Sequence, residues 1–218
     1  MSFRVLSTKI LSAAQQQLLL NADVSFVHTN FIQIKAIPFN SPLIIQNAIF
    51  TSMNALKIVL DHKIEIQNCF CVGTKTKAFA ESQNLQVIAF ANDAENLSSI
   101  LVKEYAEKSF TFFCGAKRRD ILPNTLKAKN IALKEIITYN TFLTPKKMDS
   151  RYNGVLFFSP SAVESYVQLN ALSNTIAFCI GHTTATLAQK HTNKIITANI
   201  PSIENVLVQV IKHSKMIN

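Results

Sequence analysis

FFSPSAV (residues 157–163) and FCIGHTTA (residues 178–185) are the two stretches that decide the fold of this chain. Each begins with an apolar run, breaks at Gly or at small hydroxylated residues, and then continues with apolar residues at helical spacing. This pattern is typical of a buried parallel strand that ends in a short turn and leads into a helix. We therefore expect a parallel α/β sheet around both stretches.

The same pair of units occurs upstream, as IFTSMNAL (residues 49–56) and CVGTKTKA (residues 71–78). Ser52 and Gly73 are 21 residues apart, and their counterparts Ser159 and Gly181 are 22 residues apart. Two further pairs match within the same stretches, namely Ala55 with Ala162 and Thr76 with Thr184. A repeat of this kind indicates that one unit is used twice, so we predict two similar α/β lobes.

Two extended stretches that run into proline indicate where the chain passes between the lobes. Residues 31–37 alternate apolar and polar side chains and lead into Pro38, and residues 139–145 end at Pro145. We predict linkers at about residues 33–42 and 137–145. Residues 40–138 then form one lobe, inserted into a discontinuous lobe of residues 1–36 plus 143–218.

Strands and helices are expected to alternate through both lobes. The first helix is predicted at residues 10–20, with an apolar face made by Ile10, Leu11, Ala14 and Leu18. The last strand of the inserted lobe is predicted at residues 131–139, followed by the extended linker.

The composition indicates a folded protein. Among 218 residues, 48% are hydrophobic and only four are Gly, which argues against disorder and against a fibre. The chain has no apolar run near the roughly 18 residues of a membrane helix and no signal-peptide pattern, so we expect a cytoplasmic location and no membrane partner. Its four Cys residues lie in or beside apolar runs, and the Cys69-x-Cys71 spacing is interpreted as strand residues rather than a metal site.

Basic residues exceed acidic ones, giving a formal charge of +9. This excess favours an anionic partner, although it also serves solubility. A nucleic-acid-associated domain is one alternative, but it depends on charge alone, because the chain has no zinc-finger, helix-turn-helix or aromatic-basic RNA motif. We expect no nucleic-acid partner.

In their order and spacing, the motifs resemble the uroporphyrinogen-III synthase family over nearly the whole chain. The resemblance is carried by VLSTK (5–9), IFTS (49–52), Gly73 with Thr76, FFCG (112–115), RDILP (119–123), Thr138-Tyr139 with Thr141, FFSPSAV (157–163) and IGHTTA (180–185). One departure is Met53-Asn54, where many members have Pro and a basic residue, so a charged contact from this turn is not implied.

The resemblance implies two α/β lobes joined by a two-stranded linker, with the substrate held between them. It also implies a lyase of tetrapyrrole biosynthesis that converts linear hydroxymethylbilane to uroporphyrinogen III, inverting the last ring and releasing water. Such an enzyme needs no metal and no organic cofactor. The main alternative is a non-catalytic, two-lobed cytosolic binder of anionic small molecules, and in either case we expect a monomer.

Tyr139 is the catalytic candidate that the resemblance implies, as a weak acid that assists departure of the hydroxyl group; the alternative is that it only packs the linker. The candidates for substrate binding are Thr8, Thr51, Ser52, Gly73, Thr76, Gly115, Arg119, Ser159, Ser161, Gly181, His182, Thr183 and Thr184. Most of them fall at strand-to-helix turns, where helix N-termini attract anions, but Ser and Thr there also serve as caps. Three questions stay open: whether Thr76 binds a carboxylate or holds its turn, whether His182 is only an exposed turn residue, and which of Arg118 and Arg119 contacts substrate.

Overall fold

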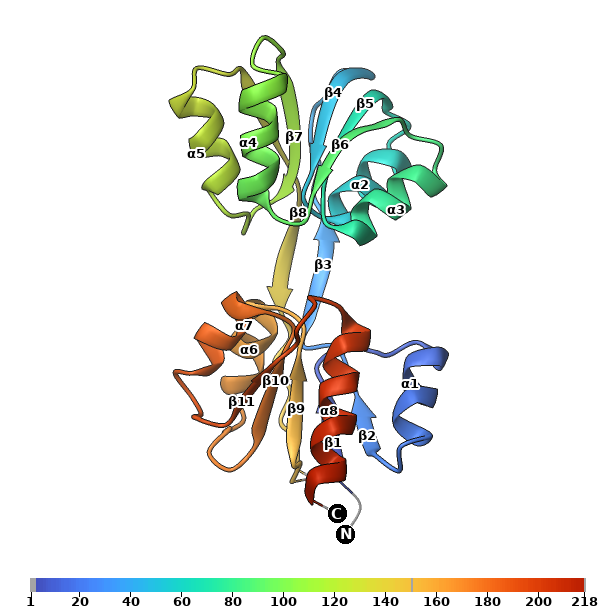
Figure 1. Ribbon diagram of the computed structural model, residues 1–218, viewed down its shortest axis with the longest axis vertical. Helices are drawn as coiled ribbons and strands as arrows, with labels where there is room; N and C mark the ends of the chain where they lie inside the picture. The colour runs from blue at the N-terminus through green and yellow to red at the C-terminus, as the bar shows by residue number, and fades with distance from the viewer. Residues whose placement is uncertain (1–2, 150, 218) are drawn as a thin grey trace. The chain divides into compact units, whose positions relative to one another are not determined.

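The structure is a computed structural model that describes residues 3–149 and 151–217 (Figure 1). Strands and helices alternate along the chain, and both sheets contain parallel pairs, which confirms the predicted α/β class. The strands are β1 (Arg4–Ser7), β2 (Ser25–His28), β3 (Ile32–Ala36), β4 (Ile44–Phe50), β5 (Glu65–Val72), β6 (Val87–Ala91), β7 (Phe110–Gly115), β8 (Leu133–Leu143), β9 (Gly154–Phe157), β10 (Ile176–Cys179) and β11 (Ile195–Thr197). The helices are α1 (Ala13–Leu20), α2 (Met53–Asp61), α3 (Thr74–Ser82), α4 (Ala94–Glu104), α5 (Ile121–Ala128), α6 (Pro160–Val167), α7 (His182–Ala188) and α8 (Ile203–Ile217).

The chain divides into two compact units. Unit 1 contains residues 1–33 and 142–218, and unit 2 contains residues 34–141. The boundaries fall inside β3 and β8, which are neighbours in one sheet. Just after β3, the Ile37 N–H donates to the Thr138 carbonyl of β8 at 3.0 Å.

Unit 2 is a three-layer sandwich. Its sheet has the strand order β3-β8-β7-β4-β5-β6, with parallel pairing from β8 to β6. Because alternate residues of a strand point to opposite faces, the sheet supports two cores. One core lies under α2 and α3 and contains the stacked rings of Phe50 and Phe113, with centroids 5.5 Å apart. The other lies on the face covered by α4 and α5 (Figure 1). It contains Phe70 and Phe112.

Unit 1 has the same layers around a parallel sheet of order β11-β10-β9-β1-β2. Helices α6 and α7 cover the core that contains Phe157 and Tyr166. Helices α1 and α8 cover the core on the other face, which contains Leu156 and Phe178.

The two sheets are topologically equivalent once β3 is set aside. The order β6-β5-β4-β7-β8 in unit 2 corresponds to β11-β10-β9-β1-β2 in unit 1. The helices correspond as well, because each face of each sheet is covered by two helices that contact each other. In unit 2 these pairs are α2 with α3 and α4 with α5, and in unit 1 they are α6 with α7 and α8 with α1. The two units differ in chain order. In unit 1 the strands β1 and β2, which correspond to β7 and β8, precede β9–β11 in the sequence, and unit 2 lies between them.

Two predicted elements were wrong at their ends. The first helix begins at Ala13, not at residue 10, because Ser12 caps it in a capping box with Gln15. Its predicted apolar face was also wrong: Ile10 precedes the helix and is 56% exposed, whereas Leu19 is fully buried. The predicted strand at residues 131–139 and the linker after it are one continuous strand, β8, because β8 pairs first with β7 and also with β3.

No helix in the described ranges is long and apolar enough to span a lipid bilayer.

Candidate functional site

The predicted site residues of unit 2 lie at the carboxyl edge of its sheet. Thr51 and Ser52 follow β4, Gly73 follows β5, and Gly115 is the last residue of β7. In parallel α/β sheets this edge is where ligands bind, because the N-termini of the following helices present unpaired backbone N–H groups there.

Ser52 connects the first of these turns to β8. It is the N-cap of α2, and its Oγ accepts a hydrogen bond from the Asn54 backbone N–H at 3.2 Å. The Tyr139 phenol donates a second hydrogen bond to the same oxygen, also at 3.2 Å. Both side chains are half-buried, so this polar pair lies at the border between core and solvent.

Gly115 makes room for the Tyr139 ring. The two residues are partners in the β7–β8 register, just after an irregularity between Cys114 and Gly115. A Cβ at Gly115 would lie 2.5 Å from Tyr139 Cζ and 2.8 Å from its hydroxyl oxygen. The neighbouring Thr138 is fully buried, and its hydroxyl donates to the Cys114 carbonyl at 3.2 Å. This hydrogen bond holds β8 against β7 at the residue before Tyr139.

The turn after β5 requires glycine. Gly73 is the N-cap of α3 with φ of +86°, a conformation that other residues rarely adopt, and its N–H donates to the Ala91 carbonyl at 2.8 Å. Thr76, three residues later, is buried, with only 5% of its surface exposed. No described residue forms a hydrogen bond with the Thr76 hydroxyl, whose two predicted roles were to bind a carboxylate of the substrate or to hold the turn.

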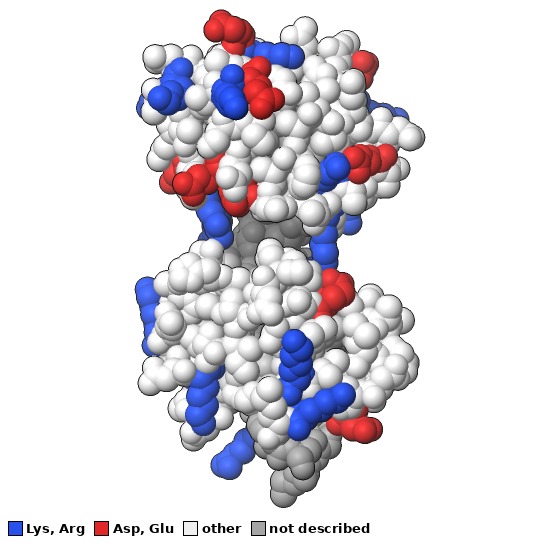
Figure 2. Space-filling model, viewed as in Figure 1, with Lys and Arg blue, Asp and Glu red and all other residues white. Residues whose placement is uncertain are grey.

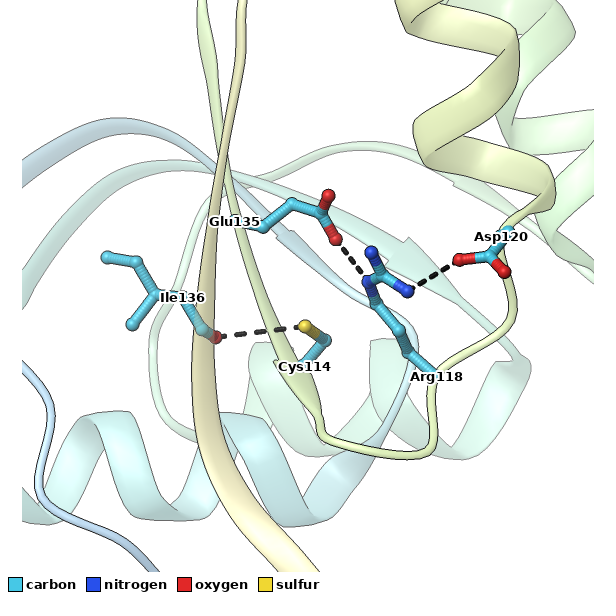
Figure 3. Close-up of polar contacts among 5 residues, drawn as sticks. All are labelled: Cys114, Arg118, Asp120, Glu135 and Ile136. Carbon is cyan, nitrogen blue, oxygen red and sulfur yellow. Dashed lines mark hydrogen bonds and ion pairs between the residues drawn. The ribbon is translucent and has the colours of Figure 1, made fainter.

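Arg118 is bound by carboxylates of unit 2 itself (Figure 3). Its Nε donates to Glu135 of β8, and its terminal nitrogen lies 2.6 Å from Asp120, the N-cap residue of α5. The hydrogen bond to Glu135 raises the pKa of the Arg118 guanidinium above its ordinary value. Arg118 therefore fastens the loop after β7, whereas Arg119 is exposed in the same loop. Sequence reasoning missed Glu135, which no motif distinguishes from other surface carboxylates.

The candidates of unit 1 also lie at the carboxyl edge of their sheet. Thr8 follows β1 and is buried, and its hydroxyl donates to the Leu156 carbonyl at 2.7 Å. Ser159 is the N-cap of α6 and accepts from the Ala162 N–H at 3.2 Å, and Ser161 is half-buried in the first turn of that helix. The structure thus gives Thr8 and Ser159 definite structural roles.

Helix α7 carries the remaining candidates of unit 1. Gly181 is its N-cap, in an extended conformation with φ of −177°, and an added Cβ would meet nothing within 4 Å. His182 and Thr183 are exposed, whereas Thr184 is only 2% exposed. His182 thus lies on the surface at the start of the helix.

The candidates do not all come together. Within unit 2, Ser52, Gly115 and Tyr139 form one contiguous group, and among the described residues no hydrogen bond joins this group to Thr76. A cavity of about 510 Å³ lies elsewhere, at the amino ends of the unit 1 strands. It is lined by Phe3, Ile176, Lys194 and His213, among others, and contains none of the candidates.

The described part of the chain contains no cluster of three or more His, Cys, Asp or Glu residues that would bind a metal ion. All four cysteines are buried free thiols, which confirms their interpretation as core residues. Figure 2 shows Lys and Arg side chains scattered over the visible face of both units rather than gathered into one band. Positive charge is therefore distributed on this face.

Comparison with known proteins gives one family. A family model described as uroporphyrinogen-III synthase HemD matches residues 15–207. The fold is similar to that of uroporphyrinogen-III synthetase from Helicobacter pylori 26695, with a TM-score of 0.71 and 18% identity over 97% of this chain and 99% of that chain. It is also similar to that of a mutant uroporphyrinogen III synthase from the extremely thermophilic bacterium Thermus thermophilus, with a TM-score of 0.65 and 11% identity over 100% of both chains. No curated protein sequence matches the chain.

Proposed function

The chain belongs to the uroporphyrinogen-III synthase family, and from this premise we propose that its carboxyl-edge turns bind hydroxymethylbilane and that Tyr139 assists departure of the substrate's hydroxyl group. As a member of this family it is an enzyme of tetrapyrrole biosynthesis that acts on a small molecule. The reaction closes a linear tetrapyrrole into a ring, inverts the last pyrrole and releases water.

The chemistry of this substrate explains why the proposed binding groups are backbone N–H groups, hydroxyls and cations. Hydroxymethylbilane carries eight carboxylates, which are best bound by hydrogen-bond donors and by the partial positive charge at helix N-termini. Helices α2, α3, α6 and α7 all begin at the carboxyl edges, and the chain carries a net charge of +9. We propose that the two units act as two lobes and that each contributes such turns to the substrate.

The reaction demands little acid–base chemistry from the protein. The pyrrole nitrogen supplies the electrons that expel the hydroxyl group, so the remaining tasks are to hold the chain in a reactive conformation and to protonate the leaving oxygen. A phenol can donate a proton without carrying a full charge in its resting state. The observation that carries our proposal is the hydrogen bond between Tyr139 and Ser52, which places a phenol at the carboxyl edge of unit 2.

An isomer assay tests the proposed function. Hydroxymethylbilane is generated in the presence of the purified protein, and the products are oxidised and separated into type I and type III uroporphyrins. Spontaneous closure gives type I, because the chain then closes end to end without inversion. Predominant type III is the expected result. Type I alone from a folded sample would overturn the proposal and would favour a non-catalytic binder of anionic small molecules.

Several expectations from the sequence stay predictions. They are a monomeric state, a cytoplasmic location, and the lack of a nucleic-acid or membrane partner.

A further inference from the structure

The hydrogen bonds around Ser52 leave one of its atoms without a partner. A serine hydroxyl has two acceptor lone pairs and one donor hydrogen. The Asn54 N–H and the Tyr139 phenol occupy both lone pairs of Ser52 Oγ. Within residues 3–149 and 151–217, no group accepts a hydrogen bond from the Ser52 hydroxyl. The hydrogen that this pair can offer to a ligand is therefore the one on Ser52.

The direction of the bond between the two hydroxyls follows from their chemistry. A phenol is more acidic than an aliphatic alcohol, and it is a poorer acceptor because its oxygen lone pair is delocalised into the ring. The Asn54 N–H also points at Ser52 Oγ, so that oxygen is already arranged as an acceptor. Both effects favour Tyr139 as donor and Ser52 as acceptor, which commits the Tyr139 proton to Ser52 in the free enzyme.

We propose that Ser52 donates the proton to the leaving hydroxyl group of hydroxymethylbilane, and that Tyr139 is a positioning residue that acts through Ser52. This inference rests on the proposed function. The carbon–oxygen bond breaks with its electron pair on oxygen, which takes the Ser52 proton and leaves as water. Ser52 Oγ takes the Tyr139 proton. Ring closure forms a carbon–carbon bond and releases one proton from the last ring, and this proton restores the phenol.

Comparison of the two units supports a special role for this pair. Ser159 is the equivalent cap in unit 1, and its Oγ accepts from the Ala162 N–H. Among the described residues no phenol donates to Ser159. Capping therefore requires only the serine, whereas the cap of α2 in unit 2 also binds a tyrosine. Gly115 is needed for this extra contact, because a side chain there would displace the Tyr139 ring.

A double-mutant cycle tests the order of the two groups. Single-turnover rates of type III formation are measured for the wild type, Tyr139→Phe, Ser52→Gly and the double variant. We expect Ser52→Gly to lower the rate about 10²-fold or more, as for loss of a general acid. Tyr139→Phe should lower it about 10-fold in the wild type but less than about 2-fold in the Ser52→Gly background, because its effect passes through Ser52. Ser52→Thr keeps the hydroxyl and should restore most of the rate.

Equal effects of Tyr139→Phe in both backgrounds would overturn the inference, because Tyr139 would then act on the substrate directly. A wild-type rate in Ser52→Gly would overturn it as well. Glycine is chosen because it caps helices nearly as well as serine does. Ser12→Gly, which changes the cap of α1, is the matched control and should leave the type III rate unchanged.

A proton inventory on the wild type gives a reading that needs no Ser52 variant. In mixtures of H₂O and D₂O, transfer of two protons in one step predicts a curved dependence of the rate on deuterium fraction, and Tyr139→Phe should make it linear. A linear wild-type dependence would contradict the relay. If the wild type forms only type I, the proposed function fails. If it forms type III but the cycle is additive, only the relay fails.

Discussion

Replacing Gly115 with alanine tests whether strand β7 positions the Tyr139 phenol. The new Cβ would lie 2.5, 2.6 and 2.8 Å from three atoms of the Tyr139 side chain. Favourable carbon–carbon contacts need about 3.5 Å, so the ring must move by about 1 Å. The Tyr139–Ser52 hydrogen bond is already 3.2 Å long, and a separation of about 3.6 Å no longer qualifies as one. We therefore expect Gly115→Ala to break this bond.

Two effects should follow from the displaced ring. Overpacking of a well-packed region costs about 1–3 kcal/mol, so the free energy of unfolding, measured by urea denaturation, should fall by that amount. The rate of type III formation per folded molecule should fall to the level of Tyr139→Phe, because both changes remove the same hydrogen bond.

The chain offers a matched control for the steric effect. A Cβ at Gly154 would lie 2.5 Å from the Phe178 ring in unit 1, at the start of β9. Gly154→Ala should thus destabilise the protein by a similar amount while the rate per folded molecule stays at the wild-type level. In a Tyr139→Ala background, Gly115→Ala should cost little, because the ring that it meets is gone. A full cost in that background, or an unchanged rate in the single variant, would refute the reasoning.

Three further predictions concern the stability of the units. Arg118→Gln and Glu135→Gln should each lower the free energy of unfolding by about 1 kcal/mol, less at 1 M salt, because this ion pair is partly exposed; a loss that does not depend on salt would contradict an electrostatic role. Burial raises the pKa of Cys114 from 9.0 to about 11 and that of Cys179 to about 12, so the folded state holds these protons more tightly. The stability that these two thiols contribute is complete below pH 9, and it is lost as the pH rises to about 11 for Cys114 and about 12 for Cys179. Denaturation curves across this range should show the loss, and the double Cys→Ala variant should weaken it. Thr8→Val should cost about 1 kcal/mol in thermal or urea unfolding, because the Leu156 carbonyl keeps its bond to the Thr8 N–H when the hydroxyl is removed.

The order of strands and helices could be predicted from the sequence because local signals determine it. Ser52 and Ser159 cap the helices that follow β4 and β9, and the apolar runs before them are buried strands. The register of β8 could not be predicted in the same way. No Gly or Pro interrupts residues 133–143, so the sequence does not show which part of the strand pairs with β7 and which with β3.

The start of α1 was missed for a local reason. Ile10 and Leu11 fit the helical spacing, but the capping box of Ser12 with Gln15 supplies hydrogen bonds that start the helix at Ala13. Leu11 is nevertheless buried, because the segment before the helix packs into the core of unit 1. A periodic pattern therefore identified a core residue but assigned it to the wrong element.

The contacts of the candidate site depend on pairs that are distant in the sequence. Tyr139 and Ser52 are separated by 87 positions, and Arg118 and Glu135 by 17. Motifs placed Tyr139 and Ser52 among the candidates separately, and only the strand order brings them together. Gly115 shows the same limit: it was predicted as a binding residue, whereas its position against the Tyr139 ring gives it a steric role.

Duplication within the chain helps to separate the demands of folding from those of chemistry. Both units have a serine cap, a glycine cap and a buried threonine at the third position of the helix that follows the glycine. Since each unit must fold, the shared features need no functional explanation. The group of Ser52, Gly115 and Tyr139 is different, because the cap works in unit 1 with the Ala162 N–H and without a phenol. Capping requires neither the half-buried phenol of Tyr139 nor the glycine at position 115 that leaves room for it. A role in the reaction is therefore the better explanation for these two residues.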